Sequence, residues 1–329
     1  MLQQLVDTRL NRVDYERTTA TAREDPAIEA LTTIQNKILD GSVAEGMHDL
    51  MPLLQGRRLR SSESAWSEFV GKCLAHPLRE LVHQDPFTYR VFSKPRGYAG
   101  DAVMLDYVYG RDEGWPVPEG TTALGEKIFQ YTTGTPACEA VRARRGLVAN
   151  LVDRLADETP NPDILAVACG HLREALLCST IRRRRFNRYL ALDSDPVSLQ
   201  EVERCYGRFG VESCNAGVRQ LLTRRLDIGL FDLIYSTGLF DYLQLPAARR
   251  LTACFFDFLR PRGRLLIANF LPGILGVGYM ESYMDWKLIY RTQLDMLAIA
   301  DEISLQNIHD IRIFAEENQN IIFLQLTKR

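Results

Sequence analysis

Two residues with the spacing of a nucleotide-binding pair stand in the second half of the sequence. The segment DILAVACGHLREALL, residues 163–177, is a strand-like apolar run that leads into a turn at Gly170, and Asp193 ends the next apolar run, RYLALD. A glycine at a strand-to-helix turn lets a nucleotide approach the backbone, and a carboxylate about 20 residues further on can reach ribose hydroxyls. The pair indicates a nucleotide-like ligand, although a single glycine and a strand-ending aspartate also occur by chance in α/β domains.

The elements that would position this pair alternate in type after about residue 150. Short strand-like runs alternate with helical ones, and this pattern predicts a parallel, doubly wound sheet. Before residue 150 the apolar residues recur at helical spacing, so this half is expected to be all-helical. The expected strands are DILAVA, RYLALD, VESCN, FDLIYS, RLLIANF, IHDIRIFAE and NIIFLQLTK, with a short turn at residues 317–319 between the last two.

Composition narrows the class of protein. With 329 residues, 46% of them hydrophobic, the chain can bury two cores, which predicts two domains. A net charge of -2 gives no overall attraction to nucleic acid or anionic membranes, and the arginine run at residues 182–185 is interpreted as a solvated helix end. The seven cysteines show no ligand spacing, so reduced thiols and no metal are expected. The N-terminal segment MLQQLVDTRLNRVDYER lacks the order of a signal peptide, and no run is apolar enough to span a membrane, so a cytoplasmic protein is expected.

From about Leu147 to Arg329 the order of segments resembles the class I S-adenosylmethionine (SAM) dependent methyltransferases. VACGHL stands at the glycine-rich first motif of that family, ALDSD at the second, CNAGV at the third, FDLIYS at the fourth and LRPRGRLLI at the post-motif. A narrower resemblance, to a bacterial subgroup with a helical domain in front, is carried by FSKPRGYAGDAVMLDYVYG, the GxxRE pattern at Gly170–Glu174, IYSTGLFDYL and YMESYMDWKLIYRT.

The resemblance implies an α/β fold with SAM as the cofactor. Residues 1–146 would form a helical lid or substrate domain, and residues 147–329 a Rossmann-like SAM-binding domain. Its sheet would have seven strands, the last pair antiparallel.

The resemblance also implies the cofactor contacts. Asp193 would hold the ribose, Asn215 and Ala216 would bracket adenine, and the small residues after the fourth strand would let SAM pass. The loop KPRGYAGD, residues 94–101, is suited to a lid because it is rich in glycine and charge. The whole predicted set is Gly97, Tyr98, Gly170, His171, Arg173, Asp193, Ser194, Asn215, Ala216, Ser236 and Gly238.

The first motif departs from the family where His171 and Leu172 replace its second glycine. Arg173 could form a paired hydrogen bond with the SAM carboxylate, and Glu174 could hold the arginine or receive the ammonium. Both could equally be exposed residues of a first helical turn. His171 alone is more typical of a structural hydrogen bond than of a base.

The candidate catalytic residues are Tyr98, Tyr242 and Tyr290, because an aromatic face attracts a desolvated cation such as the sulfonium of SAM. Phe240, Asp241 and Tyr242 are expected to face the molecule that approaches the sulfonium. As alternatives, Tyr98 could anchor a domain interface, and the aromatic residues at positions 279, 283, 286 and 290 could be core packing.

Three functions follow from the resemblance. The first is methyl transfer from SAM to a small-molecule acceptor such as a carboxylate, in the biosynthesis of a secondary metabolite or signal, by a monomer or homodimer. The bacterial subgroup of the narrower resemblance includes enzymes similar to those that make 3-hydroxy fatty acid methyl esters. The second is cyclisation of SAM itself to azetidine-2-carboxylate with release of methylthioadenosine. The third is a SAM-binding interaction protein without turnover, whose expected signature, loss of Asp193, is not seen.

Overall fold

The computed structural model describes residues 25–223 and 226–329, so the N-terminal segment MLQQLVDTRLNRVDYER lies outside the described residues. The described chain begins with helices, as the apolar spacing predicts. These are α1 (Pro26–Leu39), α2 (Val43–Arg60), α3 (Glu63–Ala75), α4 (Leu78–Val82), α5 (Pro86–Ser93), α6 (Ala102–Glu113), α7 (Ala123–Thr132) and α8 (Pro136–Glu158).

Capping side chains fix where these helices begin. Asp85 accepts hydrogen bonds from the N–H groups of Phe87 and Thr88 at the start of α5, and Pro86 occupies the first turn, where its missing N–H costs nothing. Asp101 caps α6 through the N–H of Met104. The cap of α6 therefore also ends the loop KPRGYAGD at a defined point.

The second half alternates strands and helices, as predicted. The strands are β1 (Asp163–Val167), β2 (Arg188–Asp193), β3 (Val211–Asn215), β4 (Phe231–Ser236), β5 (Leu259–Phe270), β6 (Ile308–Ala315) and β7 (Ile321–Lys328). Between them lie η1 (Arg173–Leu176), α9 (Ser179–Arg182), α10 (Pro196–Tyr206), η2 (Gly207–Phe209), α11 (Val218–Leu222), η3 (Phe240–Tyr242), α12 (Leu245–Asp257), α13 (Val277–Tyr283), α14 (Gln293–Ala298) and η4 (Leu305–Asn307).

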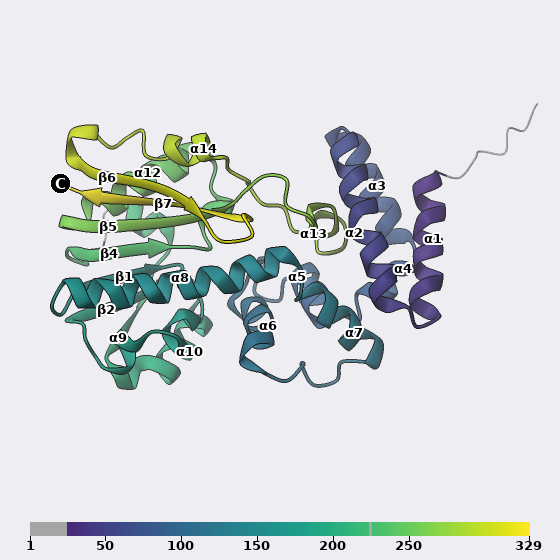
Figure 1. Cartoon of the computed structure of the whole chain (residues 1–329), viewed down its shortest axis with the longest axis horizontal. Coiled ribbons are helices and arrows are strands. Elements are labelled where there is room, and N and C mark those ends of the chain that lie inside the picture. The colour runs from purple at the N-terminus through teal and green to yellow at the C-terminus, as the bar shows by residue number, and fades with distance from the viewer. Residues whose placement is uncertain (1–24, 224–225) are drawn as a thin grey trace, which may run out of the picture.

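The strands of the described residues form one seven-stranded sheet in the order β3-β2-β1-β4-β5-β7-β6. The first five strands are parallel, and β7 is antiparallel to both β5 and β6. The expected α/β sheet of seven strands, with its antiparallel last pair and preceding helical region, is confirmed. Figure 1 shows helices α1 to α7 beyond the end of the sheet toward which the parallel strands run.

Both faces of the sheet are covered, which explains why its inner strands read as continuous apolar runs. Alternate residues of β1 belong to different cores: Ile164 and Ala166 pack with α8 and α10, whereas Leu165 and Val167 pack with α12 and α14. The first core continues without a break into the helical half, from Leu31 of α1 onwards. One of the two cores is therefore shared by both halves.

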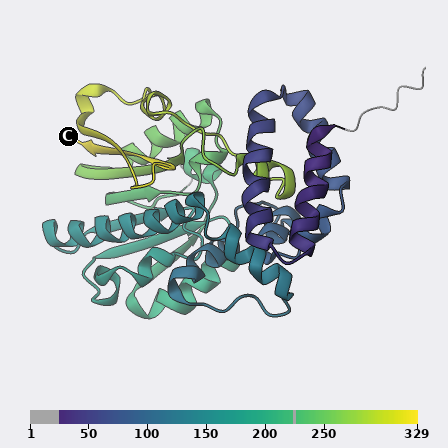
Figure 2. The same ribbon diagram turned by 45° about the vertical axis from the view of Figure 1, so that its right-hand side comes forward.

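Two elements join the halves physically. Helix α8 runs across residue 146 and lies along the sheet (Figures 1 and 2), so the boundary at 146/147 falls within a continuous helix, and the division into two domains stays a prediction. Helix α13 follows β5 in the chain but packs against α2 and α3 of the helical half. Among the described residues, no helix combines the length and the apolar character required to cross a bilayer.

The segment LRPRGRLLI differs from its prediction as a turn followed by a strand. Strand β5 already begins at Leu259, which pairs with Phe231, and the next pair is Leu233 with Arg264. The residues between form a bulge in which Arg262 has a φ of 68°. A Cβ on Gly263 would lie 2.9 Å from the carbonyl oxygen of Phe231, so the bulge requires glycine there.

Candidate functional site

The site lies where the sheet reverses its direction of winding. From β1 the chain moves outward to β2 and β3, and from β4 it moves the other way to β5, so β1 and β4 are neighbours at the centre. Ligands of open α/β sheets bind at the carboxyl ends of the strands at such a switch point. The loops that follow β1 and β4 therefore form the two sides of the candidate site.

The loop after β1 has an unusual backbone. Ala168, Gly170 and Leu172 all have left-handed conformations, with φ of 52°, 54° and 53°. This conformation costs energy for residues other than glycine, and such strain is concentrated at functional sites. A Cβ on Gly170 would lie 3.2 Å from the Cβ of Ala102 at the start of α6. The loop thus makes its turn with one glycine, and that glycine stands close to the helical half.

Asp193 joins the predicted loops to one another. Its carboxylate accepts hydrogen bonds from the N–H of Gly170 at 2.8 Å and from the N–H of Asp195 at 2.9 Å. Its main-chain oxygen accepts from the N–H of Ala216 at 3.0 Å and from the side-chain amide of Asn215 at 3.1 Å. Four of the predicted cofactor contacts therefore lie together. The exposed Ser194 follows directly.

Asp195, and not Asp193, is the N-cap of α10. Its side chain accepts from the N–H of Val197, and Pro196 occupies the first turn of the helix. The capping role is thus filled by the neighbour, as the position of the proline predicts. Asp193 is buried at the strand end, where it holds the backbone of Gly170 and Asp195.

A carboxylate of the helical half holds the loop after β1. Asp106 of α6 contacts His171 Nδ1 at 2.8 Å and accepts two hydrogen bonds from Arg173, each at 2.7 Å. Arg173 also pairs with Glu201 of α10 at 2.9 Å. Burial alone would raise the pKa of Asp106, but the hydrogen bonds from Arg173 and His171 outweigh it and lower that pKa.

Glu174 has a different partner from the one considered from the sequence. It does not hold Arg173; its carboxylate accepts a hydrogen bond of 2.6 Å from the hydroxyl of Tyr235, which is bonded in turn to Tyr189. Burial raises the pKa of Glu174. Because two carboxylates occupy the guanidinium of Arg173, contact with a ligand carboxylate is not required to satisfy it.

The loop KPRGYAGD spans the site as a strap, a name used here for residues 94–101. Lys94 pairs with Asp285, and Arg96 donates to Asp195 at 2.7 Å and to Ser198 at 2.9 Å. Beyond Gly97, which has a φ of 86°, Tyr98 remains 40% exposed. Burial of the Tyr98 hydroxyl and then the charge of Asp193 raise its pKa, so Tyr98 lies near the cofactor contacts.

Aromatic side chains gather beneath the strap. The hydroxyl of Tyr242 accepts a hydrogen bond of 2.9 Å from Trp286 Nε1, and a Cβ on Gly100 of the strap would overlap that hydroxyl. The hydroxyl of Tyr290 is buried and has no hydrogen-bond partner among the described residues. Tyr242 and the strap are therefore in direct contact.

The expectation that Phe240 faces the molecule approaching the sulfonium is wrong. Its side chain is fully buried in the second core and packs edge-on against Phe255. Asp241 accepts a hydrogen bond from the N–H of Phe270, and burial raises its pKa to about 6. The short helix η3 turns these residues in different directions, which a run of three letters does not reveal. Tyr279 and Tyr283 are likewise buried, as the alternative of core packing predicts.

Two residues of the site escaped prediction from the sequence. Arg144 of α8 is buried and donates to the carbonyl oxygen of Thr237, just after β4. It stands in line with Val141 and Val148 on the apolar face of the helix. A charged residue that interrupts an apolar face is visible in the sequence and could have been used to predict Arg144. Asp106 offered no such signal, because its partners lie far along the chain.

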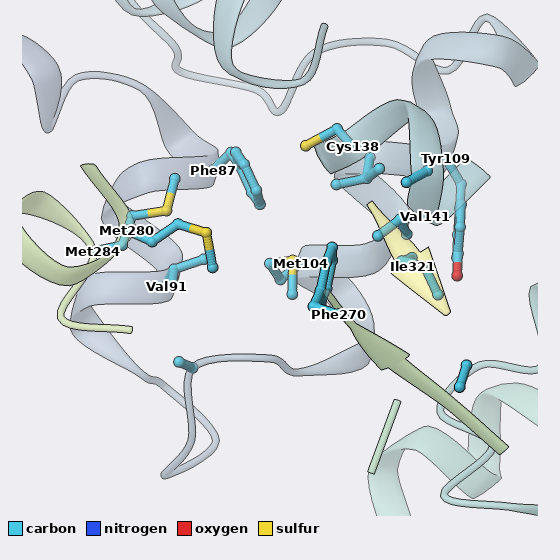
Figure 3. Close-up of a cluster of buried hydrophobic side chains, with 14 of the residues drawn as sticks. Phe87, Val91, Met104, Tyr109, Cys138, Val141, Phe270, Met280, Met284 and Ile321 are labelled. Atoms are coloured by element: carbon cyan, nitrogen blue, oxygen red, sulfur yellow. The ribbon is translucent and has the colours of Figure 1, made fainter. Parts of the chain in front are cut away.

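An apolar cavity of ≈ 60 Å³ adjoins the aromatic cluster. Figure 3 shows side chains from α5, α6, α8, β5 and α13 gathered around it, including Phe87, Met104, Cys138, Phe270 and Met280. Phe270 and Trp286 line it. The N–H of Phe270 donates a hydrogen bond to Asp241, and Trp286 Nε1 donates one to the hydroxyl of Tyr242. Two residues of the cavity lining are thus hydrogen-bonded to residues that follow β4. Within the described ranges, no cluster of three or more His, Cys, Asp or Glu side chains is arranged to hold a metal.

Comparison with known proteins gives a likeness of fold. No family model matches the chain, and no curated protein matches it. It is similar to the crystal structure of a possible exported protein from Bordetella parapertussis, with 16% identity, a TM-score of 0.56 and coverage of 94% of this chain and 99% of that one.

Two further solved structures are more distant. Magnesium protoporphyrin IX methyltransferase from Synechocystis PCC 6803, with bound S-adenosylhomocysteine (SAH), is 12% identical over 69% of this chain and 99% of its own, with a TM-score of 0.43. N-methyltransferase NodS from Bradyrhizobium japonicum WM9, in complex with SAH, is 12% identical over 68% of this chain and 99% of its own, with a TM-score of 0.42. Of these three structures, the Bordetella protein is similar enough to bear on the fold, and at 16% identity it bears on the fold alone.

Proposed function

We propose that the chain binds SAM at the carboxyl ends of β1, β2 and β4 and transfers its methyl group to a small-molecule acceptor. The observation that carries the proposal is the hydrogen bond between Gly170 and Asp193. It joins a glycine turn and a strand-ending carboxylate at the switch point of a methyltransferase-like sheet.

The residues present fit the proposed ligand. Ser236 Oγ and His171 Nε2 are buried and have no hydrogen-bond partner among the described residues. Buried polar atoms are rarely left unpaired. Ser236 ends β4 and His171 stands in the loop after β1, so both residues lie beside the switch point. When Nδ1–H of His171 donates to Asp106, Nε2 is an acceptor. It is thereby suited to an ammonium donor, and Asp193 is suited to ribose hydroxyls.

Arg173 has a positioning role in this proposal. Its ion pairs with Asp106 and Glu201 tie the loop after β1 to α6 and α10. We therefore assign the direct contacts to Gly170, His171 and Asp193, and we assign to Arg173 the maintenance of the loop's left-handed backbone.

Bound SAM supplies a methyl group on a positively charged sulfur. The chain contributes the aromatic faces of Tyr98, Tyr242 and Tyr290, which favour a cation, and a dry surrounding that keeps water from the reacting atoms. Alignment of two bound reactants then accounts for much of the expected acceleration. A carboxylate acceptor is already a nucleophile and requires no base.

The apolar cavity favours methyl transfer over cyclisation of SAM. Cyclisation involves a single substrate, whereas a space beside the aromatic cluster provides for a second one. A cavity that ends at Phe270 and Trp286 would bring an acceptor to the residues that follow β4. Cyclisation to azetidine-2-carboxylate is kept as the competing outcome of the test.

The test is incubation of the purified protein with SAM alone, followed by mass spectrometry of the products. We expect SAM to remain intact and to bind measurably, and we expect SAH to form once an acceptor is added, with carboxylates tried first. Methylthioadenosine with an equal amount of a four-carbon amino acid would establish cyclisation instead. Binding without turnover across the acceptor panel would favour the non-catalytic alternative.

A further inference from the structure

The apolar cavity adjoins a depression at the surface of the helical half. This depression of ≈ 410 Å³ lies between α2 and α7 and is lined by Ala44, Lys127, Gln130, Tyr131, Pro136 and neighbouring residues. Met51, Thr135 and Leu275 line both the depression and the cavity. These three side chains therefore lie between the two spaces; the depression is called the mouth, and the two spaces together are called the passage.

The inner part is suited to an apolar group. Met51, Met104, Met280 and Met284 all line it, and methionine adapts its shape to irregular apolar ligands. The polar groups there are already satisfied: Thr132 donates to Asp85, and Thr135 donates to the carbonyl oxygen of Thr132. A polar segment placed in the cavity would give up its hydrogen bonds to water and find no free partner there, whereas an apolar segment has no such hydrogen bonds to lose.

The mouth has the opposite character. Of the ten residues that line the depression, Arg111 and Lys127 are charged, and both are cations. Within residues 25–223 and 226–329 neither belongs to an ion pair, and Arg111 makes one hydrogen bond of 2.6 Å, to the carbonyl oxygen of Gln130. The remaining N–H donors at the mouth are thus available to an anion.

We propose that the acceptor is an anionic amphiphile that spans this passage. Its nucleophilic atom lies at the Phe270 and Trp286 end, its apolar segment fills the cavity, and a second group, anionic and remote from the methylated atom, lies against Arg111 and Lys127. The assignment rests on the proposed methyl transfer. In that step a lone pair of the acceptor forms a bond to the methyl carbon while the carbon–sulfur bond breaks, and its electrons remain on sulfur as SAH. Any proton on the acceptor atom is released to solvent.

The test compares probes that share one chain and differ in the head group. Octyl phosphate, 1-octanol and inorganic phosphate are titrated calorimetrically into the full-length protein, with and without saturating SAH. The same titrations are made on Arg111→Gln/Lys127→Gln, whose changes are on exposed side chains. Lys72→Gln, an exposed lysine of α3, is the matched control.

We expect octyl phosphate to bind more tightly than either of the other probes. The double variant should bind octyl phosphate roughly five- to tenfold more weakly, because two solvent-exposed charge contacts are removed. Its binding of 1-octanol should be unchanged. Lys72→Gln should behave as the unmodified protein. Equal octyl phosphate binding by the double variant would refute the role of the mouth, and equal binding of phosphate and octyl phosphate would refute the role of the cavity.

Failure of the proposed function has a different signature. SAM is titrated into the same preparation, and absence of SAM binding would overturn methyl transfer whatever the alkyl probes show. SAM binding that the double variant leaves unchanged, together with its loss of octyl phosphate affinity, supports both proposals.

Discussion

At the scale of single residues, the carboxylate of Asp193 has two roles: it holds the loop after β1 by a hydrogen bond, and it is the proposed contact of the ribose. It accepts the N–H of Gly170, so its complete removal would disturb the loop as well as the ligand. Asn at this position keeps nearly the same shape and one acceptor oxygen, but its amide nitrogen replaces the other oxygen that accepts a backbone N–H. The substitution therefore weakens one contact of the loop as well as the charge-assisted hydrogen bonds to the ligand, and the loss of SAM affinity contains both contributions.

Asp193→Asn is expected to weaken SAM binding by about 1–3 kcal/mol, which is roughly a 5- to 150-fold rise in Kd. Isothermal titration calorimetry with SAM is the measurement. Glu212→Gln removes an exposed carboxylate of the neighbouring strand β3, which pairs with Arg188, and should leave the affinity unchanged. If Asp193→Asn bound SAM as tightly as the control, the ribose assignment would have to be abandoned.

Asp106 tests whether the helical half holds the SAM loop in shape. Asp106→Asn weakens the contacts to both His171 and Arg173, whereas Glu201→Gln weakens only one contact of Arg173. We expect a rise in the KM for SAM of about tenfold for the first variant, with a smaller change in kcat, and a lesser effect for the second. Steady-state kinetics with an identified acceptor, accompanied by SAM calorimetry, measures both. Equal effects, or loss of kcat alone, would contradict the positioning role.

At the scale of elements, the strap is the segment that closes the proposed site. Its ion pairs reach two different parts of the chain, Asp195 on α10 and Asp285 after α13. Because a Cβ on Gly100 would overlap the hydroxyl of Tyr242, any larger residue there requires either the strap or the Tyr242 side chain to shift.

Gly100→Ala is expected to displace the strap from Tyr242 and to lower kcat/KM for SAM by about tenfold or more. Gly71→Ala is the matched control, because Gly71 lies on an exposed face of α3 with open space around its Cα. The control should retain activity and gain about 0.5–1 kcal/mol of stability from its helix propensity. Retention of full activity by Gly100→Ala would show that contact between strap and Tyr242 is dispensable.

At the scale of the whole molecule, buried carboxyls make stability depend on pH. Burial raises the pKa of Asp85 and of Asp241 to about 6, above the ordinary value of 3.8 expected in the unfolded chain. The folded protein therefore binds these protons more tightly than the unfolded chain. Each carboxyl contributes stability that is fully present below about pH 4 and is lost as the pH rises through 6.

Asp241→Asn removes one of these titrations. Relative to the unmodified protein, the variant should gain on the order of 1–3 kcal/mol between pH 4 and pH 7, because the amide has no proton to lose. Thermal or urea unfolding at several pH values measures the difference. Glu302→Gln changes an exposed carboxyl and serves as control. A constant difference between Asp241→Asn and the unmodified protein across this range would contradict the argument.

The local patterns of the sequence were sufficient for the elements and for part of the site. Apolar runs located all seven strands, and the order Asp195–Pro196 located the start of α10. The spacing of Gly170 and Asp193 predicted that both serve one ligand, and in the structure a hydrogen bond joins them. These features depend on contacts within a few residues or on the ends of neighbouring strands, so they are visible in the sequence.

Contacts between distant segments were decided only by the tertiary structure. Asp106 and His171 are 65 residues apart in the chain, and neither segment indicates the other. The orientation of Phe240 into the core, the partner of Glu174 and the bulge in β5 depend on which neighbours lie beside each backbone. The cavity is lined by residues of seven elements from both halves, α2, α5, α6, α7, α8, β5 and α13. The sequence by itself therefore determined the sheet and the position of the proposed cofactor, whereas the packing of the helical half against that sheet decided the shape of the acceptor site.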